Sequence, residues 1–293
     1  MKALLYATLL LGLVAGSVQA GTILVVTDCQ VPGVADGDHN DDSLVTFLQG
    51  LGHTVDTYGM NKTMQGVWDA TDQQHADDAD LIVFSRRTNS GAYNNPAQWN
   101  TQATPLLLQS GQSGYLTRDS RWDWTTGGSA DVTRTETDMA IKAGQTGHFS
   151  LTAVHTITGP VKLFDWSGVP LGNNQSPKGI YNPLETDCDV AGTILVGTMD
   201  TATVRGMLLE LPQGTDTGNG VLGAQRVFFS HWGYDDSTTG VNGPGGTPSE
   251  WEDYITQDYK NVMENIITTM IPEPATLALL AAGVAATLIR RKK

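Results

Sequence analysis

The sequence is 293 residues long and carries 17 Lys and Arg against 31 Asp and Glu, a formal net charge of −14 at pH 7. A surface this acidic repels nucleic acid and anionic lipid, so neither is expected as a partner of the folded part. Cys29 and Cys188 are the two cysteines, and outside the cytoplasm they can form a disulfide or stay as two buried thiols.

The first 20 residues have the pattern of a secretory signal peptide. Lys2 is followed by an apolar run over residues 3–14, and the segment closes with Ser17, Val18, Gln19 and Ala20. This order predicts cleavage by signal peptidase after Ala20. An uncut membrane anchor is the alternative, but the apolar run is short for a span.

Strands and helices alternate through the first 120 residues. The wholly apolar, β-branched run over residues 22–27 predicts a strand buried on both faces of a parallel sheet. Helices are expected over residues 41–50 and 99–109, the second despite Pro105, and further strands over residues 54–58, 81–85 and 114–117. This alternation predicts an α/β domain with a doubly wound, mostly parallel sheet.

The second half of the chain, after Arg121, is expected to be richer in strands. Residues 250–270 carry apolar side chains at helical spacing, which predicts a helix that covers one face of the sheet. One globular domain is therefore expected over residues 21–271. Short apolar and β-branched runs separated by Gly, Pro and Asn predict strands over residues 152–158, 161–164, 193–197, 204–211 and 226–230.

Four phrases of the sequence resemble a known fold family. They are Ile23–Asp28, Gly52–Val55, Ala79–Phe84 and Arg226–Gly233. Together they are similar to the class I glutamine amidotransferase-like fold, and most of all to its trehalose-utilisation (ThuA-like) branch. The resemblance implies a flavodoxin-like, doubly wound sheet over about residues 21–270, with a β-rich second half.

The catalytic residues of that family are not matched. Its nucleophile is a cysteine on a sharp turn after the fourth strand, where this chain has Tyr115–Ser120 and no cysteine. Cys29 follows the first strand instead and lacks flanking glycines, and Ser85 and Ser120 lack the Gly-x-Ser-x-Gly elbow of serine hydrolases. No catalytic residues are therefore predicted, and the amidotransferase activity does not carry over.

The acidic loop that follows the first strand is a candidate calcium site. Asp36, Asp38 and Asn40 match the first three ligand positions of an EF-hand-like loop, since oxygens at alternating positions can turn toward one ion. The match ends there, because Asp41 stands at the glycine position and Phe47 at the position of the bidentate Glu. The alternative is a solvated loop whose last carboxylates cap the following helix.

Arginines that follow two of the predicted strands make a second candidate site. Ligands of open α/β sheets bind at the carboxyl ends of the strands, and Arg86 and Arg118 stand there. Guanidinium groups suit the anionic groups of an acidic saccharide, and nearby aromatic rings can stack on sugars. The alternative is that the arginines pair with surplus aspartates and the tryptophans fill the core. The candidate ligand-binding residues are Arg86, Arg118, Arg121, Asp28, His231 and Trp122.

The C-terminal end, residues 272–293, forms a distinct segment. Pro272, Glu273 and Pro274 precede an apolar stretch over residues 275–289 and a terminal Arg-Arg-Lys-Lys cluster. This order resembles the PEP-CTERM sorting signal. The resemblance implies a transient transmembrane segment recognised by an exosortase, in proteins linked to extracellular polysaccharide and biofilm. A plain C-terminal membrane anchor with its basic end in the cytoplasm is the alternative.

These patterns predict an exported, envelope-associated, non-catalytic binding or matrix protein linked to extracellular polysaccharide. Its expected partners are signal peptidase, an exosortase and an acidic polysaccharide. The alternative is a carbohydrate-acting hydrolase of the amidotransferase-like fold that uses the arginine site. No cofactor is predicted apart from the candidate calcium ion.

Overall fold

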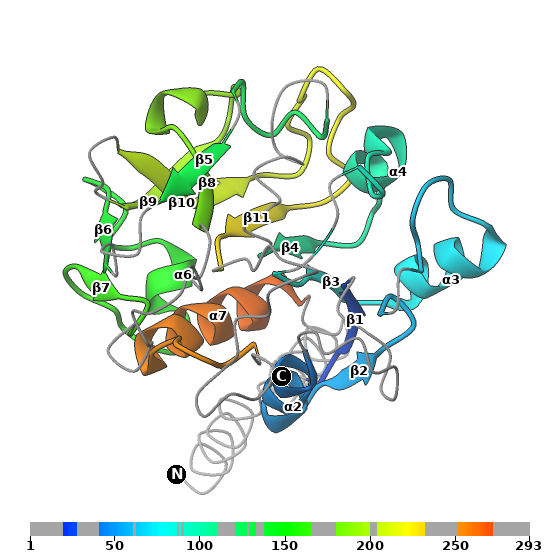
Figure 1. Cartoon of the computed structure of the whole chain (residues 1–293), viewed down its shortest axis with the longest axis horizontal. Coiled ribbons are helices and arrows are strands. Elements are labelled where there is room, and N and C mark those ends of the chain that lie inside the picture. Colours follow the sequence, from blue (N-terminus) through cyan, green and yellow to red (C-terminus); the bar gives the residue numbers. More distant parts are fainter. Residues whose placement is uncertain are drawn as a thin grey trace, which may run out of the picture.

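The computed structural model describes residues 20–27, 41–60, 63–86, 88, 91–109, 121–127, 129–132, 138–165, 180–199, 204–231 and 251–271. Its centre is a nine-stranded sheet in the order β2-β1-β3-β4-β11-β10-β9-β6-β7 (Figure 1). The strands are β1 (Thr22–Val26), β2 (Thr54–Asp56), β3 (Leu81–Phe84), β4 (Leu106–Leu108), β6 (Asp138–Ile141), β7 (Val161–Lys162), β9 (Ile194–Met199), β10 (Arg205–Leu211) and β11 (Arg226–Phe229). A separate antiparallel pair consists of β5 (Ser129–Val132) and β8 (Ile180–Pro183).

The nine-stranded sheet has a parallel half and an antiparallel half. Neighbouring strands from β2 to β11 run parallel, whereas each neighbouring pair from β11 to β7 is antiparallel. Within this sheet only β10 and β6 run against the other strands, so the predicted α/β domain with a mostly parallel sheet is confirmed. The carboxyl ends of β1, β3, β4 and β11 meet at one edge, the place where such sheets bind ligands.

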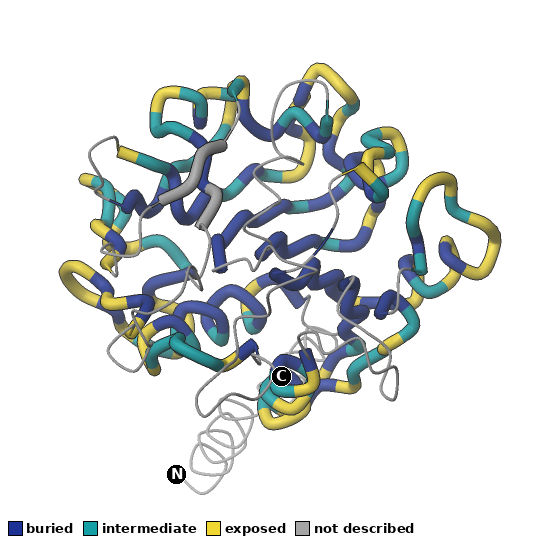
Figure 2. Tube along the Cα trace, in the orientation of Figure 1, coloured by how far each residue is buried: buried dark blue, intermediate teal, exposed yellow. Residues whose placement is uncertain are grey.

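Strands β1, β3, β4 and β11 are almost wholly buried (Figure 2), which explains the apolar runs within them. Alternate side chains enter two different cores: Ile23 and Val25 of β1 belong to one, and Leu24 and Val26 to the other. Each such side chain, when fully buried, contributes about 1.5–3 kcal/mol relative to an exposed position.

One face of the sheet is covered by α2 (Asp42–Gly50), α6 (Phe149–Thr152) and α7 (Gln257–Met270). Thr256 caps the start of α7, because its side chain accepts the N–H of Tyr259 at 3.2 Å. The helix then buries an apolar stripe whose members recur at helical spacing. These members are Tyr259, Val262, Met263, Ile266, Ile267 and Met270.

Asn265 interrupts that apolar stripe and fixes the chain after α6 onto α7. Its side chain is buried, and its carbonyl oxygen accepts the N–H groups of Val154 and His155 at 2.7 Å each. Its amide nitrogen donates to Ser150 O and His155 O at 3.0 and 2.9 Å. All four bonds of one amide are therefore used, as a buried polar side chain in an apolar core requires.

The other face is covered by α3 (Ala70–Asp78), α4 (Pro96–Thr101) and a group of packed aromatic rings. Trp99 and Trp122 stack with ring centroids 5.5 Å apart, and Phe84 of β3 meets both edge to face. Aromatic pairs in this geometry add about 0.5–1.5 kcal/mol beyond the area that they bury.

The single helix predicted over residues 99–109 is wrong. Its first part belongs to α4, which ends at Thr101, and residues 106–108 form β4 between β3 and β11. Pro105 separates the two elements, since proline lacks an N–H and keeps the residue before it out of the helical region. The strand predicted over residues 114–117 lies outside the described residues.

The strand predicted over residues 152–158 is also wrong. Thr152 is the last residue of α6, and the backbone N–H of Ile157 turns back to Leu151 O at 2.8 Å. The helix predicted over residues 250–270 is confirmed in its second part, which begins at Gln257. The sequence did not indicate α3, β5, β6 or β8. The remaining predicted strands and the helix over residues 41–50 are present within a few residues of their expected bounds.

Candidate functional site

Buried polar side chains collect where β1, β3, β4 and β11 end. Backbone bonds align these strand ends: the N–H of Ser85 donates to Val26 O at 2.9 Å, and the N–H of Gln109 to Phe84 O at 2.8 Å. A lone polar group at this depth costs about 1–3 kcal/mol, so each one must be paired or serve a ligand. This group, the strand-end cluster, comprises Thr27, Asp41, Ser85, Arg86, Gln109, Ser230 and His231, each at most 1% exposed.

Arg86 forms a buried ion pair in the strand-end cluster. Its Nε donates to Asp41 Oδ1 at 3.3 Å, and the two side chains are 1% and 0% exposed. Asp41 stands at the N-cap position of α2, but its side chain makes no capping bond there. The carboxylate that the sequence offered as a helix cap therefore neutralises a buried guanidinium, as buried charges require.

Gln109 links the end of β4 to α7. Its amide nitrogen donates to the Tyr259 hydroxyl at 3.0 Å, and its oxygen accepts from Trp251 Nε1 at 3.3 Å. Nε2 of His231 lies 2.9 Å from Trp251 O, so this nitrogen carries the proton, since a carbonyl can only accept. Burial raises the pKa of Tyr259 well above its ordinary value, although Gln109 and the charge of Arg86 oppose the shift.

Two oxygen atoms of the strand-end cluster have no hydrogen-bond partner within the part of the chain that the structure describes. They are Asp41 Oδ2 and Ser85 Oγ, and the buried Thr88 Oγ1 nearby in the sequence is a third such atom. Native proteins leave few buried polar atoms unsatisfied, so a partner for these oxygens is expected outside the described residues. A hydroxyl-rich ligand or ordered water can supply it.

The structure brings together only some of the predicted ligand-binding residues. Arg86 and His231 both belong to the strand-end cluster. The carbonyl oxygen of Arg121 accepts from Asn219 Nδ2 at 3.2 Å in the connection that leads into β11, a contact that involves the backbone of Arg121 alone. Asp28 and Arg118 lie outside the described residues, and their roles stay predictions.

Trp122 is not available for stacking on a sugar in this structure. Its side chain is fully buried, with Phe84, Trp99 and Trp124 rings against it, and its Nε1 donates to Tyr93 O at 3.0 Å. Here the alternative interpretation, in which the tryptophans fill the core, describes the observed packing.

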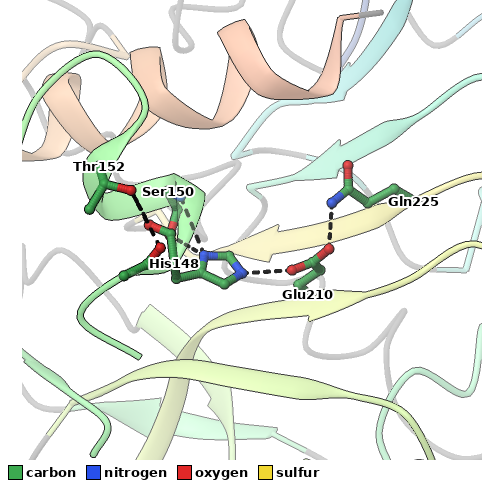
Figure 3. A network of polar contacts seen from close by, with 6 residues as sticks. His148, Ser150, Thr152, Glu210 and Gln225 are labelled. Carbon is green, nitrogen blue, oxygen red and sulfur yellow. Dashed lines mark hydrogen bonds and ion pairs between the residues drawn. The ribbon is translucent and has the colours of Figure 1, made fainter. Parts of the chain in front are cut away.

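A second polar network lies beside α6 (Figure 3). His148 Nδ1 accepts the N–H of Ser150 at 3.3 Å and lies 2.8 Å from its hydroxyl, while Nε2 lies 2.6 Å from Glu210 Oε2. Gln225 donates to the other oxygen of Glu210. The contacts run from Ser150 through His148 to Glu210, as in the triad of a serine hydrolase. However, Ser150 is fully buried and the imidazole of His148 caps α6. The network therefore supports a structural role.

Glu210 provides a pH-dependent prediction. Burial alone would raise its pKa, but the bonds from His148 and Gln225 outweigh burial and hold the pKa below its ordinary value of 4.5. The stabilisation is therefore complete above the ordinary pKa and is lost as the pH falls through the lowered value in the folded state. Glu210→Gln should lower the free energy of unfolding by about 1–2 kcal/mol at pH 7, and by less near pH 3, in urea titrations.

Glu264→Gln is the matched control for Glu210. Glu264 pairs with His155 at 2.9 Å, but the two side chains are 21% and 37% exposed. This more exposed pair should contribute less than about 1 kcal/mol. A loss at Glu264 as large as that at Glu210 would contradict the assignment.

Cys188 is a buried thiol whose Sγ lies 3.3 Å from Leu184 O. Burial, helped by the charges of Asp187, Glu185 and Asp189, raises the pKa of this thiol to about 12. We expect Cys188 in a Cys29→Ser variant to react with iodoacetamide at pH 8 at least 100-fold more slowly when folded than in urea, because the thiolate is the reactive form. Equal rates in the folded and unfolded protein would contradict this prediction.

Cys29 lies outside the described residues, so the disulfide with Cys188 stays a prediction. Mass measurement with and without reductant tests it.

The candidate calcium ligands Asp36, Asp38 and Asn40 also lie outside the described residues. Within the described ranges, no group of three or more His, Cys, Asp or Glu side chains could hold a metal ion. Calcium binding by the acidic loop therefore stays a prediction, which melting with calcium and with a chelator tests.

Sequence reasoning missed several residues that organise the strand ends. Gln109 directly follows the three leucines of β4, and a polar residue after a buried strand is the signal that could have indicated it. The role of Asp41 had no such signal, because its partner Arg86 is 45 residues away.

Comparison with known proteins bears on the tail. The family model of the PEP-CTERM protein-sorting motif matches residues 271–293. The resemblance of this segment is thereby confirmed, and the motif indicates an exported protein with a C-terminal membrane-anchoring signal that is sorted by an exosortase. Searches of curated proteins and of solved structures find no match, so no relative supports the ThuA-like resemblance. None of the described helices is long and apolar enough to cross a membrane, and residues 275–289 lie outside the described ranges.

Proposed function

We propose that this chain is a non-catalytic binding or matrix protein of the cell envelope, linked to extracellular polysaccharide. Signal peptidase removes residues 1–20, an exosortase processes the tail, and the domain over residues 21–271 acts outside the cytoplasm. The observation that carries the proposal is the sorting motif over residues 271–293. An acidic domain surface fits this setting, since like charge keeps the protein soluble and apart from anionic lipid.

The sorting step can be tested in cells that contain the exosortase. The intact protein should yield a product that has lost its C-terminal segment, whereas a variant with Pro272, Glu273 and Pro274 changed to Ala should remain full length in the membrane fraction. Loss of the C-terminal segment from both proteins, or from neither, would contradict the proposal.

The arrangement of the sheet supports a flavodoxin-like domain. The order β2-β1-β3-β4-β11 across the parallel half is the one expected for a doubly wound sheet of this type. Membership of the class I glutamine amidotransferase-like fold, and of its ThuA-like branch, is part of this proposal.

The strand-end cluster supports a saccharide as the ligand. Asp41 Oδ2 and Ser85 Oγ lack a hydrogen-bond partner among the described residues, but both atoms are buried, so sugar hydroxyls reach them only if the strand ends open. Arg86 already pairs with Asp41, so an anionic group of the ligand needs another cation, and Arg118 after β4 is the candidate. Asp28 and His231 complete the proposed site.

Arg121 offers a matched control for Arg118, because its backbone contact places it by the connection into β11. In calorimetric titration with a uronic-acid oligosaccharide, Arg118→Ala should weaken binding about tenfold or more, and Arg121→Ala should leave it unchanged. A lost bond to a charged group corresponds to a change of this size. Equal affinity of both variants and the unmodified protein would remove the acidic-saccharide site.

A further inference from the structure

The predicted signal-peptidase site lies at the start of the first strand. Ala20 is exposed, Gly21 is buried, and Gly21 leads directly into β1. The N–H of Gly21 donates to His53 Nδ1 at 3.2 Å, and Gly21 O accepts the N–H of Thr54 at 2.9 Å. The nitrogen that cleavage would release is therefore already held in a defined position.

Asp80 lies beside the same residue. Its Oδ2 accepts the N–H of Thr22 at 2.8 Å, and a Cβ placed on Gly21 would lie 3.1 Å from that oxygen. The same Cβ would come within 2.8 Å of Ile271 Cγ2, so glycine alone fits without a shift of its neighbours. This fit brings the backbone of residue 21 against both a carboxylate and an imidazole nitrogen.

We propose that cleavage after Ala20 turns the Gly21 nitrogen into a structural cation of the mature domain, held by Asp80 and His53. The inference rests on the proposed export. Hydrolysis of the Ala20–Gly21 peptide bond consumes one water, leaves a carboxylate on Ala20 and releases an amine that takes up a proton near neutral pH. The former amide had one N–H, whereas the ammonium has three. One continues to His53, and the two added N–H groups are available to the carboxylate of Asp80, which already accepts the N–H of Thr22.

His53 is suited to accept from this ammonium. Its side chain is 5% exposed, and burial lowers its pKa although the charge of Asp80 opposes the shift. The neutral imidazole presents a lone pair at Nδ1 toward Gly21. Asp80 and His53 are the titratable side chains that contact Gly21 or its neighbour Thr22 in the described structure. Because His53 is neutral, the positive charge of the amine is expected to be balanced by the negative charge of Asp80.

Both processed ends of the chain meet at this position. Ile271, which packs against Gly21, is the first residue matched by the sorting motif. A cation fixed at Gly21 therefore strengthens the corner of the domain from which the signal peptide and the tail both depart. Export would then yield a more stable domain than the one that carried the signal peptide.

The test compares two chains that differ at one end. One is the mature chain, residues 21–293, in detergent with a free Gly21 amine, and the other is identical but keeps Ala20. In urea unfolding at pH 7, the chain that begins at Gly21 should have a folding equilibrium constant about three- to fivefold larger than the chain that keeps Ala20. This is the range expected for a partly exposed ion pair. The advantage should be lost in Asp80→Asn, and should fade as the pH rises through the amine pKa, because a raised folded-state pKa stabilises only while the proton is bound.

Equal stability of the two chains at pH 7 would overturn the proposal, as would an advantage that survives in Asp80→Asn. The N-terminal residue of the exported protein, read by mass spectrometry, separates this inference from the proposed function. A terminus other than Gly21 would overturn the inference but leave sorting by the exosortase intact. If the sorting experiment failed while Gly21 was still the N-terminal residue and its amine still stabilised the domain, sorting by the exosortase would be overturned and this inference would stand.

Discussion

Arg226→Ala is expected to lower the free energy of unfolding by about 4 kcal/mol. Arg226 begins β11 with its side chain 0% exposed. Burial lowers its pKa to about 9, which still leaves the guanidinium charged at neutral pH. Its two terminal nitrogens donate to five backbone carbonyls at the end of α4 and the start of β4 and β11. These belong to Trp99, Asn100, Gln102, Thr104 and Gln225.

The predicted loss has two physical sources. The carbonyls at the end of a helix have no partner within it, so removing their donor leaves several buried acceptors unpaired. Alanine also leaves a cavity where the long side chain stood, and cavities of this kind add to the cost. Urea titration of the unfolding transition measures the sum.

Two further variants control the Arg226 experiment. Arg226→Lys keeps the charge but offers fewer donors in a different geometry, so we expect an intermediate loss. Arg205→Ala removes a half-buried arginine that makes one comparable bond, from Nη1 to Asn182 O at 2.9 Å, and should cost about 1 kcal/mol. If Arg226→Ala and Arg205→Ala had the same midpoint, the carbonyl-binding role of Arg226 would be refuted.

The parallel half of the sheet could be predicted because burial on both faces leaves a simple pattern. β1 and β3 each carry an uninterrupted apolar run of four residues, and this is what a strand between two helical layers requires. The same simplicity misled the prediction at β4. Three leucines after Trp99 suit a buried helix and a buried strand equally, and only the sheet itself decides between them.

Helix α3 escaped prediction for the opposite reason. Its sequence, ATDQQHADD, is almost wholly polar and buries only Asp72 and Ala76, so it has no apolar stripe to recognise. The signal that could have revealed it is the start. Asp69 caps the backbone of Thr71 and Asp72, and Asp72 returns a bond to the N–H of Asp69.

In the candidate site, too, some residues could be predicted from the sequence and others could not. Arg86 and His231 could be placed from the sequence, because each follows a predicted strand and parallel strands end at a common edge. Their partners could not, since Asp41 and Trp251 reach them through tertiary packing. The burial of Trp122 was equally hidden, because an aromatic residue in a loop-like sequence can face solvent or fill the core beneath.

The second large effect is expected at the buried pair of Arg86 and Asp41. Arg86→Met should lower the free energy of unfolding by about 3–5 kcal/mol, because it leaves the carboxylate of Asp41 buried without its cation. Asp41→Asn should also destabilise, since the guanidinium then loses its countercharge. The double variant should recover part of the loss, giving a coupling free energy of about 2 kcal/mol in a double-mutant cycle from urea titrations.

Lys260→Ala is the matched control for this pair. Lys260 Nζ lies 3.1 Å from Glu252 Oε2, a shorter separation than in the buried pair, but the side chains are 27% and 53% exposed. Water and salt screen such a pair, so its loss should cost less than about 1 kcal/mol. Additive effects at Arg86 and Asp41 would mean that the two charges do not depend on each other in solution. Arg86 would then be a second candidate cation, beside Arg118, for an anionic group of the proposed saccharide.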